Sequence, residues 1–365
     1  MNNPRSRIVF LLVVVVGVAI AGWLILRPLS PTAADSNGPL RQRSHSDPST
    51  GTVSTPAGPT ASGTPGTSSH PAYATPAPIA PVIHPALPGE GVFHPSARWI
   101  TGGSPVRVAW YRSDPANTAT RATVAWIDPT RTQLALYPGS LNPPQAPGLP
   151  QGPTMVPPSV RSRLIATFNS GFYLSTPHGS QPGSVPEGFA VNGTVYSPML
   201  KSLATLVAYA SGRVDVIPWT GGSTPAKNIV FARQNLPMIV SHGKPSPLVS
   251  QMAVWGERYR SEPLVWRTAV GVDRRGRLIY VAAPNQTPTS LAAILVHVGC
   301  VRAMELDING EWPLFISYER RGGGAPRFAF PNLNQVPTRF ITPSEKDFFA
   351  VLLRVKASTL WREPF

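Results

Sequence analysis

Residues 288–307 read PTSLAAILVHVGCVRAMELD, and this stretch decides the fold that the sequence predicts. Its first half repeats apolar residues at helical spacing and is followed by a glycine, so we expect a helix over 288–298. Its second half, 301–306, is an apolar run that is typical of a strand and ends at Asp307. A similar apolar run covers 278–283, before the helix. Strand, helix and strand in this order indicate a crossover unit within a β-rich domain.

The rest of the globular part is predicted to consist mainly of short strands. Apolar runs bounded by turn residues predict strands at 106–111, 123–128, 133–137, 203–210 and 214–219, the first three following one another as in a meander. Asn192-Gly193 between apolar runs predicts a tight hairpin turn. We expect a second helix over 344–355. The predicted fold class is therefore α+β, a β-rich mixed domain with a crossover helix.

The amino terminus has the pattern of a membrane anchor. Residues 8–26 carry no charge, and this run is long enough to cross a hydrocarbon core of ~30 Å. Arg5 and Arg7 precede it, which predicts that the amino terminus stays in the cytoplasm. A cleaved signal peptide is the alternative, with residues 19–21 as the cleavage sequence. Because the apolar run continues beyond that sequence, we expect residues 1–27 to form a cytoplasmic tip and an uncleaved transmembrane signal anchor.

A stalk is predicted between this anchor and the globular domain. Residues 28–95 consist mainly of Pro, Ser, Thr, Ala and Gly, and such a segment buries too little apolar surface to offset its ordering entropy. We therefore expect a disordered stalk over 28–95 and one domain over 96–365. In this arrangement the protein lies in the cell membrane, crosses it once, and holds its carboxy-terminal domain outside the cytoplasm.

Charge and cysteine content limit the classes of partner and compartment. The formal net charge is +15, which favours anionic partners. No helix-turn-helix, zinc-finger or RNA-binding signature is present, so we expect anionic cell-envelope glycans or sugar phosphates rather than nucleic acid; a charge that serves only solubility is the alternative. The single cysteine, Cys300, excludes an intramolecular disulfide and lies in an apolar run, so we expect a buried, inert thiol.

Three segments place polar residues after apolar, strand-like runs. They are ATFNSGFY at 166–173, WRTAVGVD at 266–273 and AMELDING at 303–310. Their order and content resemble the phosphodiester glycosidase family, which typically reads Asn-Gly-Gly-Phe-Phe, then Arg-Thr-Ala-(Val/Ile)-Gly, then Asn-Leu-Asp-Gly-Gly-Gly-Ser. The resemblance covers roughly residues 105–345 and implies that family's fold. It further implies hydrolysis of a glycosyl phosphodiester.

Asp307 is the principal carboxylate that the resemblance assigns to the site. Glu305 and Asn309 lie two residues on either side of it and would share its face in a regular strand, so we expect both to contact substrate. The alternative is an aspartate that begins a turn with Asn309-Gly310. Arg267 is expected to hold a phosphate through its planar fork, and the alternative is a structural ion pair with Asp307 or Glu305.

The remaining candidate residues come from the first two segments and from the start of the predicted hairpin. Asn169 could orient the sugar or stabilise an oxyanion, or it could form a strand-end turn with Gly171. Gly171 and Thr268 are expected to bind substrate, as members of the matched segments. Glu187 is a second acidic candidate for catalysis. Glycosidases usually need two carboxylates, but an anionic phosphate leaves readily, so positive charge can replace much of the acid's role.

No metal or cofactor motif is present, and we expect no cofactor, although a single divalent ion on Asp and Asn ligands stays open. The sequence thus predicts a hydrolase of a glycosyl phosphodiester, a sugar 1-phosphate diester, of the cell envelope. The alternative is a non-catalytic module that binds envelope polymers or sugar phosphates. The third segment bears on this choice, because Ile308, Glu311 and Trp312 stand where the family has Gly and Ser.

Overall fold

The computed structural model describes residues 75–180, 184–256 and 263–354. The predicted anchor, and most of the predicted stalk, lie outside these residues. Within the described part of the chain, no helix has the length and apolar character needed to cross a membrane.

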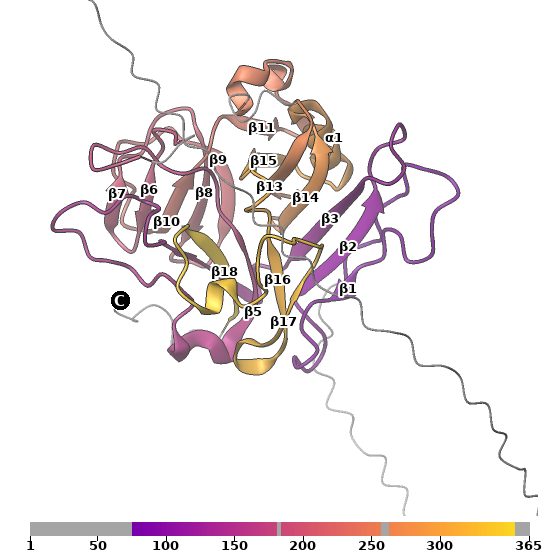
Figure 1. Ribbon diagram of the computed structural model, residues 1–365, viewed down its shortest axis with the longest axis horizontal. Helices are drawn as coiled ribbons and strands as arrows, with labels where there is room; N and C mark the ends of the chain where they lie inside the picture. Colours follow the sequence, from indigo (N-terminus) through magenta and orange to yellow (C-terminus); the bar gives the residue numbers. More distant parts are fainter. Residues whose placement is uncertain (1–74, 181–183, 257–262, 355–365) are drawn as a thin grey trace, which may run out of the picture. The chain divides into compact units, whose positions relative to one another are not determined.

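Three antiparallel sheets make up the described domain (Figure 1). The first contains, in spatial order, β1 (His94–Pro95), β2 (Val106–Arg112), β3 (Arg121–Ile127), β14 (Leu278–Gln286), β13 (Val265–Val272), β15 (Arg302–Glu305), β11 (Met238–Ser241) and β12 (Lys244–Pro245). The second contains β7 (Thr194–Ser197), β6 (Phe189–Val191), β10 (Ile229–Gln234), β8 (Ala204–Tyr209) and β9 (Val214–Pro218). The third contains β17 (Gly324–Phe328), β16 (Phe315–Arg320), β5 (Leu164–Asn169), β18 (Phe348–Leu353) and β4 (Thr132–Tyr137).

The helical elements are short. The described residues include the α-helix α1 (Pro288–His297) and the 3₁₀ turns η1 (Pro158–Arg163), η2 (Pro247–Ser250), η3 (Met252–Trp255), η4 (Arg321–Gly323) and η5 (Arg339–Ile341). Thr287 caps α1: its hydroxyl accepts from Ser290 N, and the Ser290 hydroxyl accepts from Thr287 N. The helix buries Leu291 and Leu295 and packs against β14; Figure 1 shows α1 beside this strand.

The predicted crossover unit is confirmed. β14 leads into α1 and α1 into β15, and both strands pair antiparallel with β13, which lies between them. β14 and β15 therefore run parallel to each other. The predicted tight turn is also confirmed, because Asn192 and Gly193 join β6 to β7 with φ of 49° and 81°. β8 and β9, which correspond to the strands expected over 203–210 and 214–219, pair with each other as a hairpin.

Three expectations about the fold are wrong. The helix expected over 344–355 is replaced by strand β18, which pairs with both β4 and β5 and buries side chains on both faces. The meander breaks after β3, because β4 pairs with β18 in another sheet. The domain also begins before residue 96: Ile79 is buried, and its N–H donates to Gly91 O over 2.9 Å.

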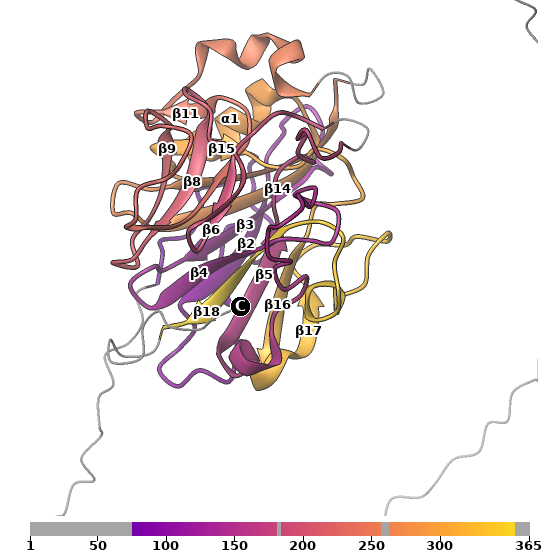
Figure 2. The same ribbon diagram turned by 90° about the vertical axis from the view of Figure 1, so that its left-hand side faces the viewer.

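Aromatic side chains join the three sheets in the core. The Phe168 ring of β5 lies 5.2 Å from Tyr280 of β14 and 5.1 Å from Phe349 of β18. Phe349 in turn lies 5.7 Å from Phe231 of β10. Figure 2 shows β5 beside β16 and β17 in the third sheet. Because β5 is packed in this way, its last residue lies against the first sheet.

Candidate active site

The ends of three strands meet at one place in the domain. Asn169 is the last residue of β5 and pairs with Phe348, the first residue of β18. Ala269 of β13 pairs with Glu305, the last residue of β15. Asn169 Nδ2 donates to Thr268 Oγ1 over 3.0 Å and so links the third sheet to the first. All three matched segments therefore converge, as the resemblance implies.

Thr268 fixes the backbone of Asp307. Its hydroxyl donates to Asp307 O over 2.9 Å and accepts from Asp307 N over 3.0 Å. Thr268 N also donates to Asp307 O, over 3.0 Å. Because this hydroxyl is buried and fully engaged, the structure gives Thr268 a positioning role instead of the expected contact with substrate.

Asn169 is likewise a structural residue in this arrangement. Its Nδ2 donates to Thr268 Oγ1 and to Ser170 O, and its Oδ1 accepts from the Tyr280 hydroxyl at 2.8 Å and from Leu314 N at 3.1 Å. Two donors and two acceptors are all that a side-chain amide offers. The amide of Asn169 therefore ties β5 to the loop before β16, and all four of its hydrogen-bonding positions are engaged in this structure.

Asp307 combines the two roles that the sequence left open. One carboxylate oxygen, Oδ1, accepts from Asn309 N over 2.9 Å and starts a turn, which Asn309 continues by accepting from Glu311 N. Asn309 thus forms the turn, and this geometry takes the place of the substrate contact expected for it. The other oxygen, Oδ2, contacts Lys346 Nζ, and both side chains are only 3% exposed.

Lys346 is a site residue that the sequence analysis missed. It lies just before β18, and its Nζ is 4.8 Å from the ring centroid of Tyr173 and 5.1 Å from that of Trp312. Burial lowers the pKa of Lys346 to about 7, with Asp347 opposing and Arg233 adding to the effect.

Two aromatic side chains and one arginine lie around this ion pair. The rings of Tyr173 and Trp312 meet edge to face at 5.9 Å, and the Arg339 guanidinium lies 4.8 Å from the Trp312 centroid. Burial raises the pKa of Tyr173 to about 12. We call the five residues Tyr173, Asp307, Trp312, Arg339 and Lys346 the Asp307 cluster.

Arg267 does not hold an open position for phosphate. Its Nη1 forms an ion pair with Glu305 Oε1, and its Nε donates to Gln286 O over 2.9 Å. The two side chains are 1% and 0% exposed. The structural ion pair with Glu305, named above as the alternative, is therefore the arrangement that the structure shows. Burial raises the pKa of Glu305 to about 7, and Arg267 opposes this rise.

Glu305 and Asp307 have different partners because β15 ends at Glu305. The strand alternation that would place both on one face stops there, as the sequence analysis allowed for Asn309. Glu305 contacts Arg267, while Asp307 contacts Lys346. The Glu305 side chain is therefore buried against the arginine.

Glu187 belongs to a buried network behind the Asp307 cluster. Its Oε1 accepts from Leu236 N at 2.6 Å, and its Oε2 lies 3.4 Å from Arg233 Nη1. Arg233 Nε donates to Asp347 over 2.9 Å, next to Lys346 in the chain. Burial raises the pKa of Glu187 to about 7, opposed by Arg233. These contacts hold the Glu187 side chain within the core.

Gly171 leaves room for a buried asparagine. A Cβ at Gly171 would lie 2.3 Å from Asn235 Oδ1. This oxygen accepts from Phe172 N at 2.9 Å, while Asn235 Nδ2 donates to Glu305 O at 2.8 Å. The glycine therefore lets Asn235 join the first segment to the third, a packing role in place of the substrate contact expected for it.

Residues 162–310 match the family model of phosphodiester glycosidases. The resemblance predicted from the three segments is thereby confirmed over that range. The catalytic domain of zebrafish N-acetylglucosamine-1-phosphodiester alpha-N-acetylglucosaminidase, auto-inhibited by its pro-peptide, is similar with 14% identity and a TM-score of 0.45, covering 72% of this chain and 88% of that one. A hypothetical protein from Synechocystis shows 15% identity and a TM-score of 0.35, covering 64% of this chain and 59% of its own. None of the curated proteins compared matches the chain.

Tyr173 and Asp307 lie within the matched range, whereas Trp312, Arg339 and Lys346 follow it in the chain. This explains why the three segments could not reveal the two cations. A signal for Lys346 is nevertheless present, because Glu345-Lys346-Asp347 directly precedes a wholly apolar run. Charged residues at the start of such a run lie at a strand end.

No group of three or more His, Cys, Asp or Glu side chains in the described ranges is placed to hold a metal ion. Cys300 is buried, as expected, and burial raises the pKa of its thiol.

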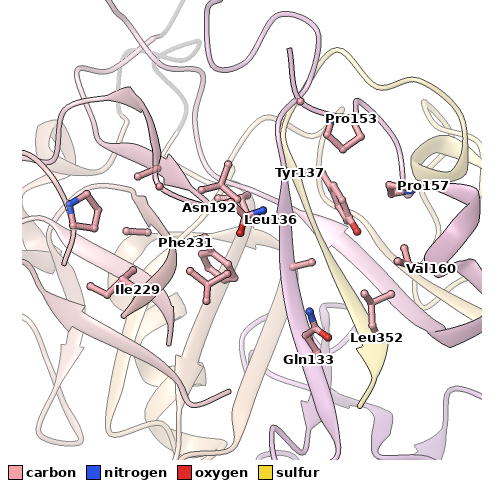
Figure 3. Close-up of a pocket in the computed structure, with 18 of the residues that line it drawn as sticks. Gln133, Leu136, Tyr137, Pro153, Pro157, Val160, Asn192, Ile229, Phe231 and Leu352 are labelled. Atoms are coloured by element: carbon pink, nitrogen blue, oxygen red, sulfur yellow. The ribbon is translucent and has the colours of Figure 1, made fainter. Parts of the chain in front are cut away.

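A groove lies apart from the Asp307 cluster, and Figure 3 shows it. One side of the groove is formed by β4 and β18, and the other side by the segments that carry Asn192 and Ile229 (Figure 3). Leu136 of β4 and Phe231 of β10 also line it. None of the five cluster residues lines it. The chemistry of the matched segments and this groove are therefore separate features of the domain.

Proposed function

We propose that this chain is a membrane-anchored hydrolase that cleaves a glycosyl phosphodiester of the cell envelope outside the cytoplasm. The family match supports hydrolysis of sugar phosphodiesters as the class of reaction. The uncharged run 8–26 and the Pro-rich segment that follows it support the anchored, external placement. The net charge of +15 supports an anionic substrate.

The single observation that carries the proposal is the contact between Asp307 and Lys346. Asp307 is the acid of the third matched segment, and it faces a cation from another part of the chain. An incoming phosphate would compete with the carboxylate for the Lys346 ammonium. Binding of substrate would then free Asp307 to act, which couples the reactive state to the presence of the phosphate.

The chemistry follows from the nature of the leaving group. Hydrolysis breaks the bond between the anomeric carbon and the ester oxygen, and that oxygen leaves with the bond's electron pair as part of a phosphate monoester. Lys346 would stabilise the charge on this phosphate, so no second carboxylic acid is required. Asp307 would act as base, taking a proton from the attacking water, or as nucleophile.

A second candidate function is a non-catalytic module that binds envelope polymers. The observation that favours it is the burial of the ion pair, since both side chains are only 3% exposed. Trp312, which stands where the family has a small residue, packs against Tyr173 above the pair. In a binding module this closed arrangement would be permanent.

The test is turnover by the full-length chain on a panel of sugar 1-phosphodiesters and nucleotide sugars, with release of free sugar as the readout. We expect turnover by the wild type and a loss on the order of 10³ in kcat/KM for Asp307→Asn. Asp114→Asn is the matched control, because the Asp114 carboxylate accepts from Ala116 N in an exposed turn.

Two results would contradict the proposal. Equal rates for Asp307→Asn and wild type would remove Asp307 from the chemistry. No turnover of any substrate, together with salt-sensitive binding of envelope polymers, would favour the binding module.

A further inference from the structure

Arg339 has two buried donors without partners in the described structure. Its Nη1 donates to Gln335 Oε1 over 2.7 Å, but Nε and Nη2 are buried and make no hydrogen bond. The nearest recorded acid is Glu345, whose Oε1 lies 3.7 Å from Nη2, beyond hydrogen-bonding distance. Leaving buried, charged donors unsatisfied is costly, so a ligand that accepts from both would be stabilised there.

The two free donors lie on one edge of the guanidinium. Nε and Nη2 point in the same direction in the plane of the group, and this edge matches two oxygens of a phosphate or carboxylate. The guanidinium carbon lies 4.8 Å from the Trp312 centroid, and Nε and Nη2 make no hydrogen bond there. Burial lowers the pKa of Arg339, and the nearby Glu345 opposes this lowering.

A second cation lies against the same aromatic ring. Lys346 Nζ is 5.1 Å from the Trp312 centroid, and the Arg339 guanidinium carbon is 4.8 Å from it. Trp312 therefore holds Arg339 in the neighbourhood of the ion pair of Asp307. The ligand chemistry that suits a guanidinium edge next to an ammonium is a doubly or singly charged phosphate group.

We infer that Arg339 binds the phosphate of the substrate in a bidentate manner, through Nε and Nη2, beside the Asp307–Lys346 pair. This inference rests on the proposed function and gives to Arg339 the role that the sequence pattern suggested for Arg267. Glu345 competes with the ligand for the same edge. Trp312 then has a use in this chain, which is to position the arginine through the contact between its ring and the guanidinium.

The test measures phosphate binding directly and does not depend on turnover. The full-length chain is titrated calorimetrically with inorganic phosphate and with dimethyl phosphate, which separates a free phosphate from a diester. We expect saturable binding of at least one probe by the wild type, and binding at least ~10-fold weaker in Arg339→Gln. Arg339→Lys should also bind more weakly, because it keeps the charge and loses the fork. Arg327→Gln is the control, since Arg327 is 69% exposed and should leave binding unchanged.

A variant that is expected to bind phosphate more tightly excludes a folding defect as the explanation for the weaker binding of the Arg339 variants. Glu345→Gln removes the competing carboxylate, and its side chain is 45% exposed, so the fold should tolerate the change. We expect phosphate to bind about 2-fold to 5-fold more tightly to this variant, as the removal of a partly exposed charge implies.

The outcomes separate this inference from the proposed function. Phosphate binding that is lost in Arg339→Gln, with no hydrolysis by the wild type, would support the phosphate subsite and overturn the enzyme. Hydrolysis with the same KM in Arg339→Gln and wild type would overturn the subsite and leave the enzyme. A wild type that binds neither probe, or an Arg339→Lys variant that binds as the wild type does, would also overturn the subsite.

Discussion

Replacing Arg267 by methionine should destabilise the domain far more than replacing Glu305 by glutamine. Glu305 is 0% exposed, its Oε2 has no hydrogen-bond partner, and Arg267 is the recorded partner of Oε1. Arg267→Met therefore leaves a buried carboxylate without compensation, which costs roughly 3–5 kcal/mol. Arg267 itself also donates to Gln286 O and Trp255 O, so those carbonyls lose a donor in this variant.

Glu305→Gln should destabilise the domain less than Arg267→Met, because the hydrogen-bond acceptors of Arg267 remain. The glutamine oxygen can still accept from Arg267, and the two carbonyl acceptors, at 2.9 and 3.1 Å, are unchanged. The loss of one charged hydrogen bond predicts a cost of roughly 1–3 kcal/mol. The double variant Arg267→Met/Glu305→Leu should recover most of the stability, since well-packed apolar residues can replace a buried ion pair.

The measurement is urea unfolding of each variant, followed by far-UV circular dichroism. A loss of 3–5 kcal/mol would remove a large part of the 5–15 kcal/mol typical of a domain and lower the Tm by roughly 10 °C. The reasoning would be refuted by Arg267→Met with wild-type stability and a large fall in substrate hydrolysis. That result would mean that Arg267 reaches the substrate.

Three further predictions concern packing, pH and topology. Gly171→Ala should lower the free energy of unfolding by roughly 1–3 kcal/mol, because the new Cβ would clash with Asn235 Oδ1; thermal melts compared with Gly222→Ala, where a Cβ meets nothing within 4 Å, would show it. Burial raises the pKa of Glu187 to about 7 in the folded state, so the folded state binds more protons than the unfolded one above pH 4.5. The free energy of unfolding should therefore fall as the pH rises from 4.5 to 7. Urea titrations should find that it falls less steeply in Glu187→Gln than in the wild type; the same dependence on pH in both proteins would contradict this prediction. Protease added to intact cells should remove the globular domain and spare the amino terminus before residues 8–26, whereas a secreted protein beginning near residue 22 would show a cleaved signal.

Local sequence patterns predicted the structure correctly where residues close together in the chain determine it. The helix near 288–298 followed from helical spacing, and its cap at Thr287 lies within the same turn. The Asn192-Gly193 turn followed from the need for positive φ at both positions. The strand β18 was missed because a strand buried on both faces shows no alternation and cannot be told from a helix by its period.

Only some residues of the Asp307 cluster could be predicted from the sequence, because the others depend on contacts between distant parts of the chain. Asp307 could be found because it ends an apolar strand within a matched segment. Lys346 and Arg339 could not be found in this way. Their partners Asp307 and Trp312 precede β16, whereas the two cations precede β18, and the two segments come together because β16 and β18 both pair with β5. The segment that contains Arg267, in contrast, was recognised from the sequence. Its ion pair with Glu305, however, depends on the pairing of β13 with β15.

The central claim, cleavage of a glycosidic bond beside a phosphate, is tested most directly by hydrolysis in ¹⁸O-enriched water. If water attacks the anomeric carbon, the phosphate monoester keeps its original oxygens and mass spectrometry finds it unlabelled, while the label enters the sugar. Attack at phosphorus would instead place one ¹⁸O in the phosphate. An unlabelled phosphate that forms at a rate dependent on Asp307 is the predicted result, and a labelled phosphate would contradict the account.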